Sequence, residues 1–315
     1  MKSGLVRHLS ESRASGPLRD FVALRRAQRD ARGTRMIANR MGLKELGSQF
    51  LAEMRAKSST LFVLGSGESV EEVTPNQWTI IKDCVSIGVN SWVVHDFIPD
   101  VYSFEQVQSS HDSDARDTMS QLLARREIAE RAPAVLLLRP HSNTHPNRVI
   151  EIPTHLRERT RVYGRTGVAT KSPQNLLRDL RQLIGSSVQA SFPAQIAIDE
   201  GMSIVRMMSL GIRAGFKSIV LVGVDFNSPR YFFDINPSYL ERRGVEGYNP
   251  WKKRGEVHGT EETDHRAFAA STYIPVFAEA ARQETGARVF VSSSSSALAG
   301  RLPVFDFATS PPHPS

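Results

Sequence analysis

The most informative stretch of the sequence is Leu61-Phe-Val-Leu-Gly-Ser-Gly-Glu-Ser69. A wholly apolar run, typical of a buried parallel strand, passes directly into the turn Gly65-Ser66-Gly67, and a helix is expected from near Ser69. Glycines let a backbone approach a ligand closely, and a helix N-terminus offers N–H groups to an anion or a nucleotide. Because Val70 stands where a dinucleotide fingerprint has its third glycine, the turn alone fits a plain strand-to-helix connection equally well.

Further apolar runs follow and alternate with helical patterns. The predicted strands are Thr60–Leu64, Val85–Val89, Asp100–Phe104, Ala134–Leu138, Arg161–Tyr163, Ser218–Val222 and Ala287–Val291. Helical patterns cover residues 113–131, 173–185, 200–214 and 265–285. Apolar strands separated by helices need a sheet that is covered on both faces. The sequence therefore predicts an α/β protein with a doubly wound, mostly parallel, Rossmann-like sheet.

The positive charge is concentrated at the N-terminus. Residues 1–57 hold 13 Lys and Arg against 5 Asp and Glu, whereas the remaining chain holds 27 against 28. A basic globular surface for nucleic acid is therefore not supported. Residues 17–57 are expected to form helices, broken near Gly33 and Gly42, with apolar positions that return to one face. These positions are Phe21, Leu24, Met36, Ile37, Met41, Leu46, Phe50, Leu51 and Met54.

Three uses of this basic segment remain open at the level of sequence. It can pack on the rest of the protein, lie on an anionic membrane surface or mediate contacts in a homo-oligomer. The predicted organisation is a helical extension over residues 1–57, a Rossmann-like catalytic domain over 58–308 and a tail over 309–315. Within that domain, residues 227–260 are rich in Pro, Gly and aromatic side chains and lack a clear period, which is typical of a lid.

Several classes of protein are excluded by composition. Cys84 is the single cysteine, so a disulfide framework is ruled out, and no Cys and His spacing indicates a zinc site. No apolar run approaches the roughly 18–20 residues of a membrane span, and the N-terminus lacks the apolar region of a secretory signal. We expect a soluble, cytoplasmic protein.

Polar side chains follow several predicted strands. Asn90 ends the second strand, Glu105 and Gln106 follow the third, and Asp225 follows Ser218–Val222. Ligands of open parallel sheets bind beyond the carboxyl ends of the strands, although Asn and Asp also serve as ordinary helix caps. Asp225 favours a function, because Phe226 and the aromatic lid come immediately after it. The serine run 292–296 occupies the same kind of position after the last strand.

Two further motifs carry candidate chemistry. His258 closes the lid ahead of a helix expected to be capped near Thr263 or Asp264, and a histidine there can take a proton from a hydroxyl nucleophile. A solvated loop histidine is the plainer alternative. The Asp-x-Asp motif in 111–114 is of the kind that holds a divalent ion, but it opens a polar helix, where its charge favours the macrodipole. No metal site is therefore predicted.

In their order along the chain these motifs resemble the bacterial lipooligosaccharide sialyltransferases, glycosyltransferase family 42. The resemblance covers roughly residues 60–305, and its most specific part is Gly223-Val-Asp-Phe226 followed by Tyr231-Phe-Phe-Asp234, with His258 and Asp264 further on. It implies a single Rossmann-like domain of the GT-A-variant type with a flexible lid. It also implies transfer of an acidic nine-carbon sugar from its CMP conjugate to a glycan or glycolipid hydroxyl, with inversion and without a metal or other cofactor.

The same resemblance implies roles for individual residues. His258 would be the general base, and Tyr231 would donate a hydrogen bond to the departing phosphate. The residues expected to bind the donor nucleotide are Gly65, Ser66, Gly67, Asn90, Gln106, Gly201, Asp225, Phe226, Ser292 and Ser293. A location at the inner face of the cytoplasmic membrane would suit a glycolipid acceptor, and residues 1–57 would supply the contact.

Some positions depart from the family pattern. Asn227 stands where the family has a second lid tyrosine, and Ser66 replaces the family's Asn. Leaving-group stabilisation would then rest on Tyr231, with Arg230 or another cation assisting. Because donor-contacting positions differ, a CMP-linked Kdo or another nonulosonic acid fits as well as sialic acid.

Two other functional hypotheses are compatible with the glycine turn. A Rossmann methyltransferase or nucleotide-dependent oxidoreductase predicts an acidic residue at the end of the second strand, where Asn90 stands. A non-catalytic Rossmann scaffold predicts that Tyr231 and His258 are replaceable without consequence.

Overall fold

One parallel sheet organises the protein. The structure is a computed structural model that describes residues 16–105, 113–139, 151–168, 170–245, 261, 263 and 267–309. Its strands are β1 (Lys44–Glu45), β2 (Thr60–Leu64), β3 (Val85–Val89), β4 (Val101–Phe104), β5 (Ala134–Leu138), β6 (Thr160–Thr166), β7 (Ile196–Ile198), β8 (Ser218–Val222) and β9 (Arg288–Val291). Their order is β1-β6-β5-β4-β3-β2-β8-β9, with β7 also on β6 and every pairing parallel. The predicted doubly wound α/β fold is confirmed.

The central strands are those that the apolar runs predict. β2 pairs with β3 from Leu61 onward and with β8 along its whole length. Strands β1 and β7 are not predicted, and they share the outer edge of β6, one toward its start and one toward its end. β1 is Lys44-Glu45, so it carries no apolar signal.

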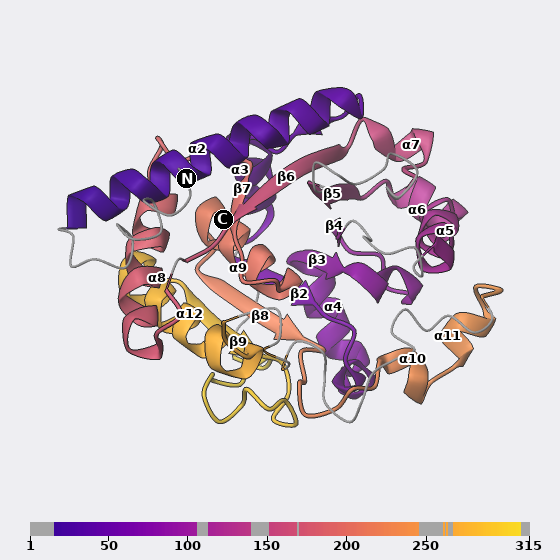
Figure 1. Cartoon of the computed structure of the whole chain (residues 1–315). Coiled ribbons are helices and arrows are strands. Elements are labelled where there is room, and N and C mark those ends of the chain that lie inside the picture. Colours follow the sequence, from indigo (N-terminus) through magenta and orange to yellow (C-terminus); the bar gives the residue numbers. More distant parts are fainter. Residues whose placement is uncertain are drawn as a thin grey trace.

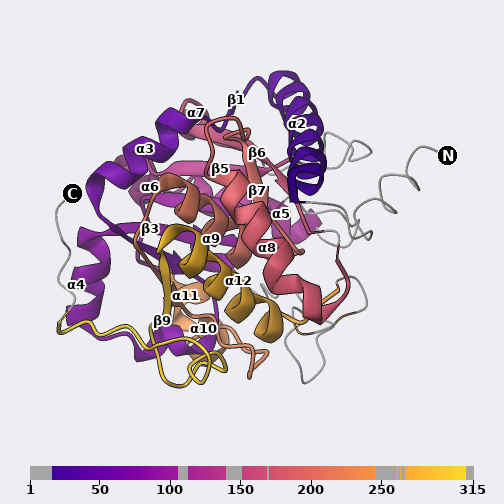
Figure 2. The same cartoon turned by 90° about the vertical axis from the view of Figure 1, so that its left-hand side faces the viewer.

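Helices cover both faces of this sheet (Figure 1, Figure 2). They are α2 (Gly16–Arg40), α3 (Ser48–Lys57), α4 (Pro75–Asp83), α5 (Ser113–Leu123), α6 (Arg126–Arg131), α7 (Thr154–Arg157), α8 (Pro173–Ser187), α9 (Ser203–Ala214), α10 (Phe232–Ile235), α11 (Ser238–Glu241) and α12 (Ala270–Thr285), with the short 3-10 helices η1 (Glu68–Glu72) and η2 (Asn90–Val94). One core lies between the sheet and α2, α3, α8, α9 and α12. The other lies beneath α4, α5, α6, α7, α10 and α11.

Several predicted helix boundaries are wrong. The pattern over 113–131 forms two helices, α5 and α6, and the pattern from residue 200 starts only at Ser203. The last helix, α12, begins at Ala270 after the N-cap Ala269, not near Thr263 or Asp264, of which Asp264 lies outside the described residues. After the glycine turn the chain forms the five-residue helix η1 rather than a long helix.

The N-terminal helix α2 runs without a break through Gly33, contrary to prediction. A Cβ at Gly33 would collide with the guanidinium of Arg139, so the missing side chain makes room for that arginine and does not end the helix. The helix ends before Gly42, which has a φ of +62°. Met36, predicted to share the buried face, is 63% exposed.

Residues 16–57 belong to the same layered body as the sheet. Ala27 and Ala31 of α2 and Leu51 of α3 join the core under that face of the sheet, and β1 hydrogen-bonds to β6. Packing on the core is therefore one of the segment's uses. No helix in the described ranges combines the length and the apolarity that crossing a membrane requires.

Candidate functional site

The sheet order reverses beside β2. The chain steps outward from β2 through β3, β4 and β5 to β6, then returns to place β8 on the other side of β2. Because β2 and β8 are parallel, the turns at Gly65 and Gly223 emerge at the same edge. In open α/β sheets this is the position of the ligand crevice.

These two turns interlock through backbone hydrogen bonds. The N–H of Gly65 donates to Val222 O at 2.7 Å, and the N–H of Gly67 donates to Gly223 O at 2.8 Å. A Cβ at Gly65 would lie 2.5 Å from Gly223 O, and one at Gly67 would lie 2.8 Å from Asp225 Cγ. The glycines are thus required by the close approach of the two turns, and nucleotide contact by Gly65, Ser66 and Gly67 stays a prediction.

Asp225 fastens η1 to the end of β8. Its carboxylate accepts the Ser69 N–H at 2.9 Å and the Ser69 hydroxyl at 2.5 Å. The side chain is buried, and burial raises the pKa of the carboxyl while the bonds from Ser69 oppose that rise. The first turn of η1 is therefore already capped from within the protein.

Phe226 adopts a strained backbone conformation at the same place. Its φ is +56°, in the left-handed region that bulky side chains rarely enter. Backbone bonds hold its surroundings, since Asp225 O accepts the N–H groups of Asn227 at 2.7 Å and of Ala297 at 3.1 Å. Strain maintained in this way is typical of ligand-contacting positions.

Tyr231 reaches the glycine turn from the start of the predicted lid. It forms an antiparallel bridge with Gly67, and the N–H of Phe232 donates to Ser66 O at 3.1 Å. The Tyr231 ring is buried and stacks on Phe233 at 4.9 Å between centroids. Arg230 pairs with Glu68 of η1 at 2.6 Å. The structure thus brings together residues 65–67, 225, 226, 230 and 231.

Asn90 lies beside this group, at the end of β3. Its φ is +48°, which asparagine tolerates better than most residues. Its side chain accepts the Glu105 N–H at 3.2 Å and donates to the Ser203 hydroxyl at 3.0 Å. Asn90 therefore joins the carboxyl ends of β3 and β4 to the start of α9.

A buried ion network continues from Asn90, and sequence reasoning missed it. Arg206 of α9 is fully buried and pairs with Glu105 and, at 2.8 Å, with Asp199. Asp199 also accepts from Arg165 at 2.9 Å and from the Gly201 N–H at 2.8 Å. Burial lowers the pKa of Arg206 to about 9. The one available signal was an arginine within a helix whose other residues, apart from two serines and Arg213, are apolar.

Gly201 belongs to this network and not to the glycine turn. It has a φ of +77°, and the Asp199 carboxylate caps the loop that Gly201 forms ahead of α9. Its predicted contact with the donor nucleotide stays a prediction.

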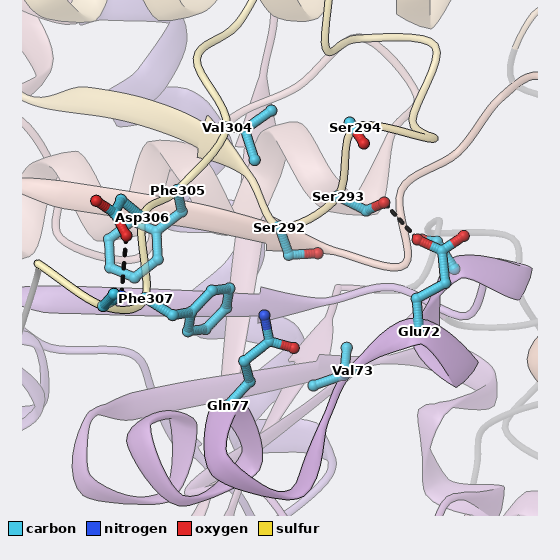
Figure 3. A pocket seen from close by; sticks show the side chains of 12 residues that line it. Glu72, Val73, Gln77, Ser292, Ser293, Ser294, Val304, Phe305, Asp306 and Phe307 are labelled. Carbon is cyan, nitrogen blue, oxygen red and sulfur yellow. Dashed lines mark hydrogen bonds between the residues drawn. The ribbon is translucent and has the colours of Figure 1, made fainter.

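Ser292 and Ser293 line a cavity of about 460 Å³ at the carboxyl end of β9 (Figure 3). Glu72, Val73 and Gln77 face these serines from η1 and the start of α4, and Val304–Ala308 close the remaining side. Glu72 accepts the Ser293 hydroxyl at 2.5 Å and the Ser295 hydroxyl at 3.0 Å. Ser69 also lines the cavity, so it adjoins the bond between Asp225 and η1.

Two predicted site residues, His258 and Gln106, lie outside the described residues. Of the predicted lid, residues 227–245 are described, and they contain α10 and α11. Among the described residues no group of three or more His, Cys, Asp and Glu side chains could hold a metal ion.

Comparisons with known proteins add a remote structural likeness. No family model matches the sequence, and no curated protein matches it. The monofunctional α-2,3-sialyltransferase Cst-I of Campylobacter jejuni is similar, with 13% identity, coverage of 78% of this chain and 80% of that chain, and a TM-score of 0.41. An apo α-2,3-sialyltransferase of the same organism shows 14% identity over 79% and 80% of the two chains and a TM-score of 0.40. A likeness at this level carries no inference about activity.

Proposed function

We propose that the protein transfers an acidic sugar from its CMP conjugate to a hydroxyl group of a glycan or glycolipid. The observation that carries this proposal is the bridge between Tyr231 and Gly67. It joins the two motifs of the sequence resemblance, the glycine turn and the aromatic start of the lid, at the reversal of the strand order. A donor bound beside this bridge would have its phosphate close to residue 231.

The form of η1 supports a nucleoside monophosphate over a dinucleotide. A pyrophosphate cradle uses the free N–H groups and the dipole of a long helix. Here the turn leads into five residues of 3-10 helix, and the Ser69 N–H is already bonded to Asp225. Such an element offers little to a diphosphate.

The residue at the end of β3 also disfavours the oxidoreductase and methyltransferase alternatives. A dinucleotide site places an acidic side chain there to bind a ribose. The residue there is Asn90, whose amide oxygen is held by the Glu105 N–H and whose amide nitrogen is held by Ser203.

The proposed reaction is a direct displacement with inversion. The acceptor oxygen forms a bond to the anomeric carbon, the bond from that carbon to the phosphate oxygen breaks, and CMP leaves with the bonding electrons. His258 takes the acceptor proton, and Tyr231 donates a hydrogen bond to the phosphate, with Arg230 nearby. Hydrogen-bond donors that are aimed at a monophosphate leaving group can replace a metal.

Release of CMP from CMP-sialic acid and from CMP-Kdo, with a panel of glycan and glycolipid acceptors and with EDTA present, tests this function. Acceptor-dependent release from either donor supports it, and failure with both, in the presence of glycan and glycolipid acceptors, contradicts it. His258→Ala should remove transfer while CMP binding persists. Retained transfer by that variant would overturn the assignment of the base.

A further inference from the structure

The exposed face of α2 carries six arginines. From residue 22 onward, none of the solvent-exposed side chains of this helix is negatively charged. The exposed residues are Arg25, Arg26, Arg29, Arg32, Arg35, Met36, Asn39 and Arg40. Arg25, Arg29, Arg32 and Met36 follow the helical repeat, so they form one stripe. At about 1.5 Å per residue the described helix is roughly 37 Å long.

The opposite face fixes the helix firmly to the sheet. Ala27, Ala31 and Thr34 are buried, and their small side chains let the helix backbone come close to β6. At Gly164 of β6 a Cβ would collide with the Thr34 hydroxyl. The helix that carries the stripe is therefore held closely against β6, and it lies at the rim of the molecule (Figure 2).

From residue 22 of α2 onward, Asp30 is the acidic side chain, and it is largely buried between Arg139 and Arg29 of the stripe. Asp30 has a side chain that is 17% exposed, and it lies 3.9 Å from Arg139 and 4.0 Å from Arg29. Arg35 pairs with Glu45 at 3.0 Å, and Gln195 also donates to Glu45, at 2.9 Å. The exposed face thus keeps a large excess of positive charge.

A groove of about 390 Å³ runs along part of this face. Arg25, Arg32 and Arg35 line it together with Gln28, Ala31, Pro193 and Gln195. Its polar lining consists of guanidinium and amide groups, which donate the hydrogen bonds that phosphate oxygens accept. The groove fits an oxyanion on a larger surface.

We propose that α2 docks the protein on an anionic phospholipid surface through this arginine stripe. The charge is one-sided, because residues 58–315 hold 27 basic and 28 acidic side chains. A helix that lies flat presents the stripe of Arg25, Arg29 and Arg32 to phosphate headgroups together, and Met36 enters the interface beside them. From residue 22 onward the exposed α2 side chains include no aromatic residue on which a nucleic acid base could stack, which favours lipid over single-stranded nucleic acid.

Docking would also orient the candidate site. Arg26 donates to Gly167 O at 3.4 Å and Arg139 donates to Asp30 O at 3.1 Å, so the first part of α2 lies by the carboxyl ends of β6 and β5. That is the edge of the sheet at which the site lies. The glycine turns follow β2 and β8, which lie beyond β5, β4 and β3 in the strand order. If the proposed transferase function holds, docking through α2 fixes the orientation of this edge relative to the membrane in which a glycolipid acceptor resides. Binding to the lipid surface itself does not depend on that function.

Flotation of the full-length protein with vesicles tests the proposal. We expect binding to phosphatidylcholine vesicles that contain phosphatidylglycerol, and little binding to phosphatidylcholine alone. The variant Arg25→Glu with Arg32→Glu should bind the anionic vesicles about tenfold more weakly or worse. The matched control, Arg126→Glu with Arg288→Glu, makes the same change of net charge at exposed positions of other elements and should bind within about twofold of the unchanged protein.

Three results would overturn the proposal. They are equal binding by the two double variants, equal binding to both kinds of vesicle, and binding to single- or double-stranded DNA that is tighter than binding to the anionic vesicles at the same salt concentration. An unchanged thermal midpoint of the double variant ensures that a loss of binding reflects the lost charges, since both side chains are exposed. Loss of binding without loss of transfer to a soluble acceptor would separate docking from catalysis.

Discussion

Asp225 and Ser69 lie 156 residues apart in the sequence, yet two hydrogen bonds join the carboxylate of the first to the backbone and hydroxyl of the second. This contact ties the end of β8 to the beginning of η1 across the reversal of the strand order. It also defines what the glycines of the turn do. The glycines leave space for the neighbouring loop that follows β8. The hydrogen bonds between Asp225 and Ser69 already fill the space beneath the turn, so any ligand must bind on the other side of it.

Replacement of Gly67 by alanine should therefore be severe. Its Cβ would collide with the Asp225 carboxylate, which two hydrogen bonds from Ser69 hold in place, and would lie 2.9 Å from the backbone oxygen of Gly223. We expect a loss of about 2–4 kcal/mol in the free energy of unfolding, measured by urea denaturation. Gly300→Ala is the matched control, because a Cβ there meets no atom within 4 Å. Equal stability of the two variants would contradict the interlocked turns.

Arg206→Met should be among the most damaging single changes. The variant leaves Glu105 and the buried Asp199 without their shared cation. Breaking a buried ion pair from one side costs about 3–5 kcal/mol, and urea denaturation measures the loss. Arg126→Met, at an exposed position paired with Glu130, should leave the midpoint almost unchanged. A mild effect at Arg206 would mean that the network is not formed as described.

His95 makes stability depend on pH. Its ring stacks on Trp92 at 4.4 Å and on Tyr239 at 5.0 Å, and the Phe97 N–H donates to Nδ1 at 2.9 Å, which leaves the proton on Nε2 facing Tyr239. Burial lowers the pKa of His95 from 6.5 to about 3; Arg243 and Arg242 add to that shift, and Asp96 opposes it. Between pH 6.5 and about 3, His95 therefore binds a proton in the unfolded chain but stays neutral in the folded protein.

The contribution of His95 to stability is complete above pH 6.5 and is lost as the pH falls toward 3. Between pH 6.5 and 5 we expect a decrease of up to about 1.4 kcal/mol per pH unit in the free energy of unfolding. His95→Phe keeps a ring but cannot titrate, so its profile should be flatter over this interval. His155→Gln, at an exposed position on α7, should keep the slope of the unchanged protein. A slope unaltered by His95→Phe would exclude a buried neutral imidazole.

Tyr231→Phe should separate turnover from donor binding. The variant keeps the ring that stacks on Phe233 and loses only the hydroxyl proposed to stabilise the leaving phosphate. Removing one donor to developing charge typically lowers kcat by about 10²-fold, whereas KM for the donor should change little. Tyr239→Phe, which removes the same atom at the contact with His95, is the control and should retain kcat. An unchanged kcat in Tyr231→Phe would remove the residue from the reaction.

The sequence predicted the central strands because each is an apolar run that is buried on both faces. β2, β3, β5 and β8 have the predicted boundaries. β1 and β7 are too short to show such a run. They are strands because they hydrogen-bond to the outer edge of β6. Helix α2 was expected to break at Gly33, because glycine disfavours a helix interior. The Arg139 guanidinium occupies the space of the missing side chain, and a contact with so distant a residue leaves no signal in the local sequence.

The candidate site was predictable where its residues follow strands, and not where they pair across the fold. The glycine turn, Asn90 and Asp225 all end predicted strands, and the structure places them at one edge of the sheet. The network of Arg165, Asp199 and Arg206 escaped prediction, because an ion pair between distant segments has no local signature. The bond between Asp225 and Ser69 escaped for the same reason, so Asp225 was interpreted only as a ligand contact.

The most direct test of the central claim is calorimetric binding of a panel of ligands to the full-length protein, with and without EDTA. The panel comprises CMP, CDP, UDP, NADH and S-adenosylmethionine. We expect CMP to bind most tightly and EDTA to leave the affinity for CMP unchanged. Preference for NADH, for S-adenosylmethionine or for a diphosphate that needs a metal would contradict the proposed function.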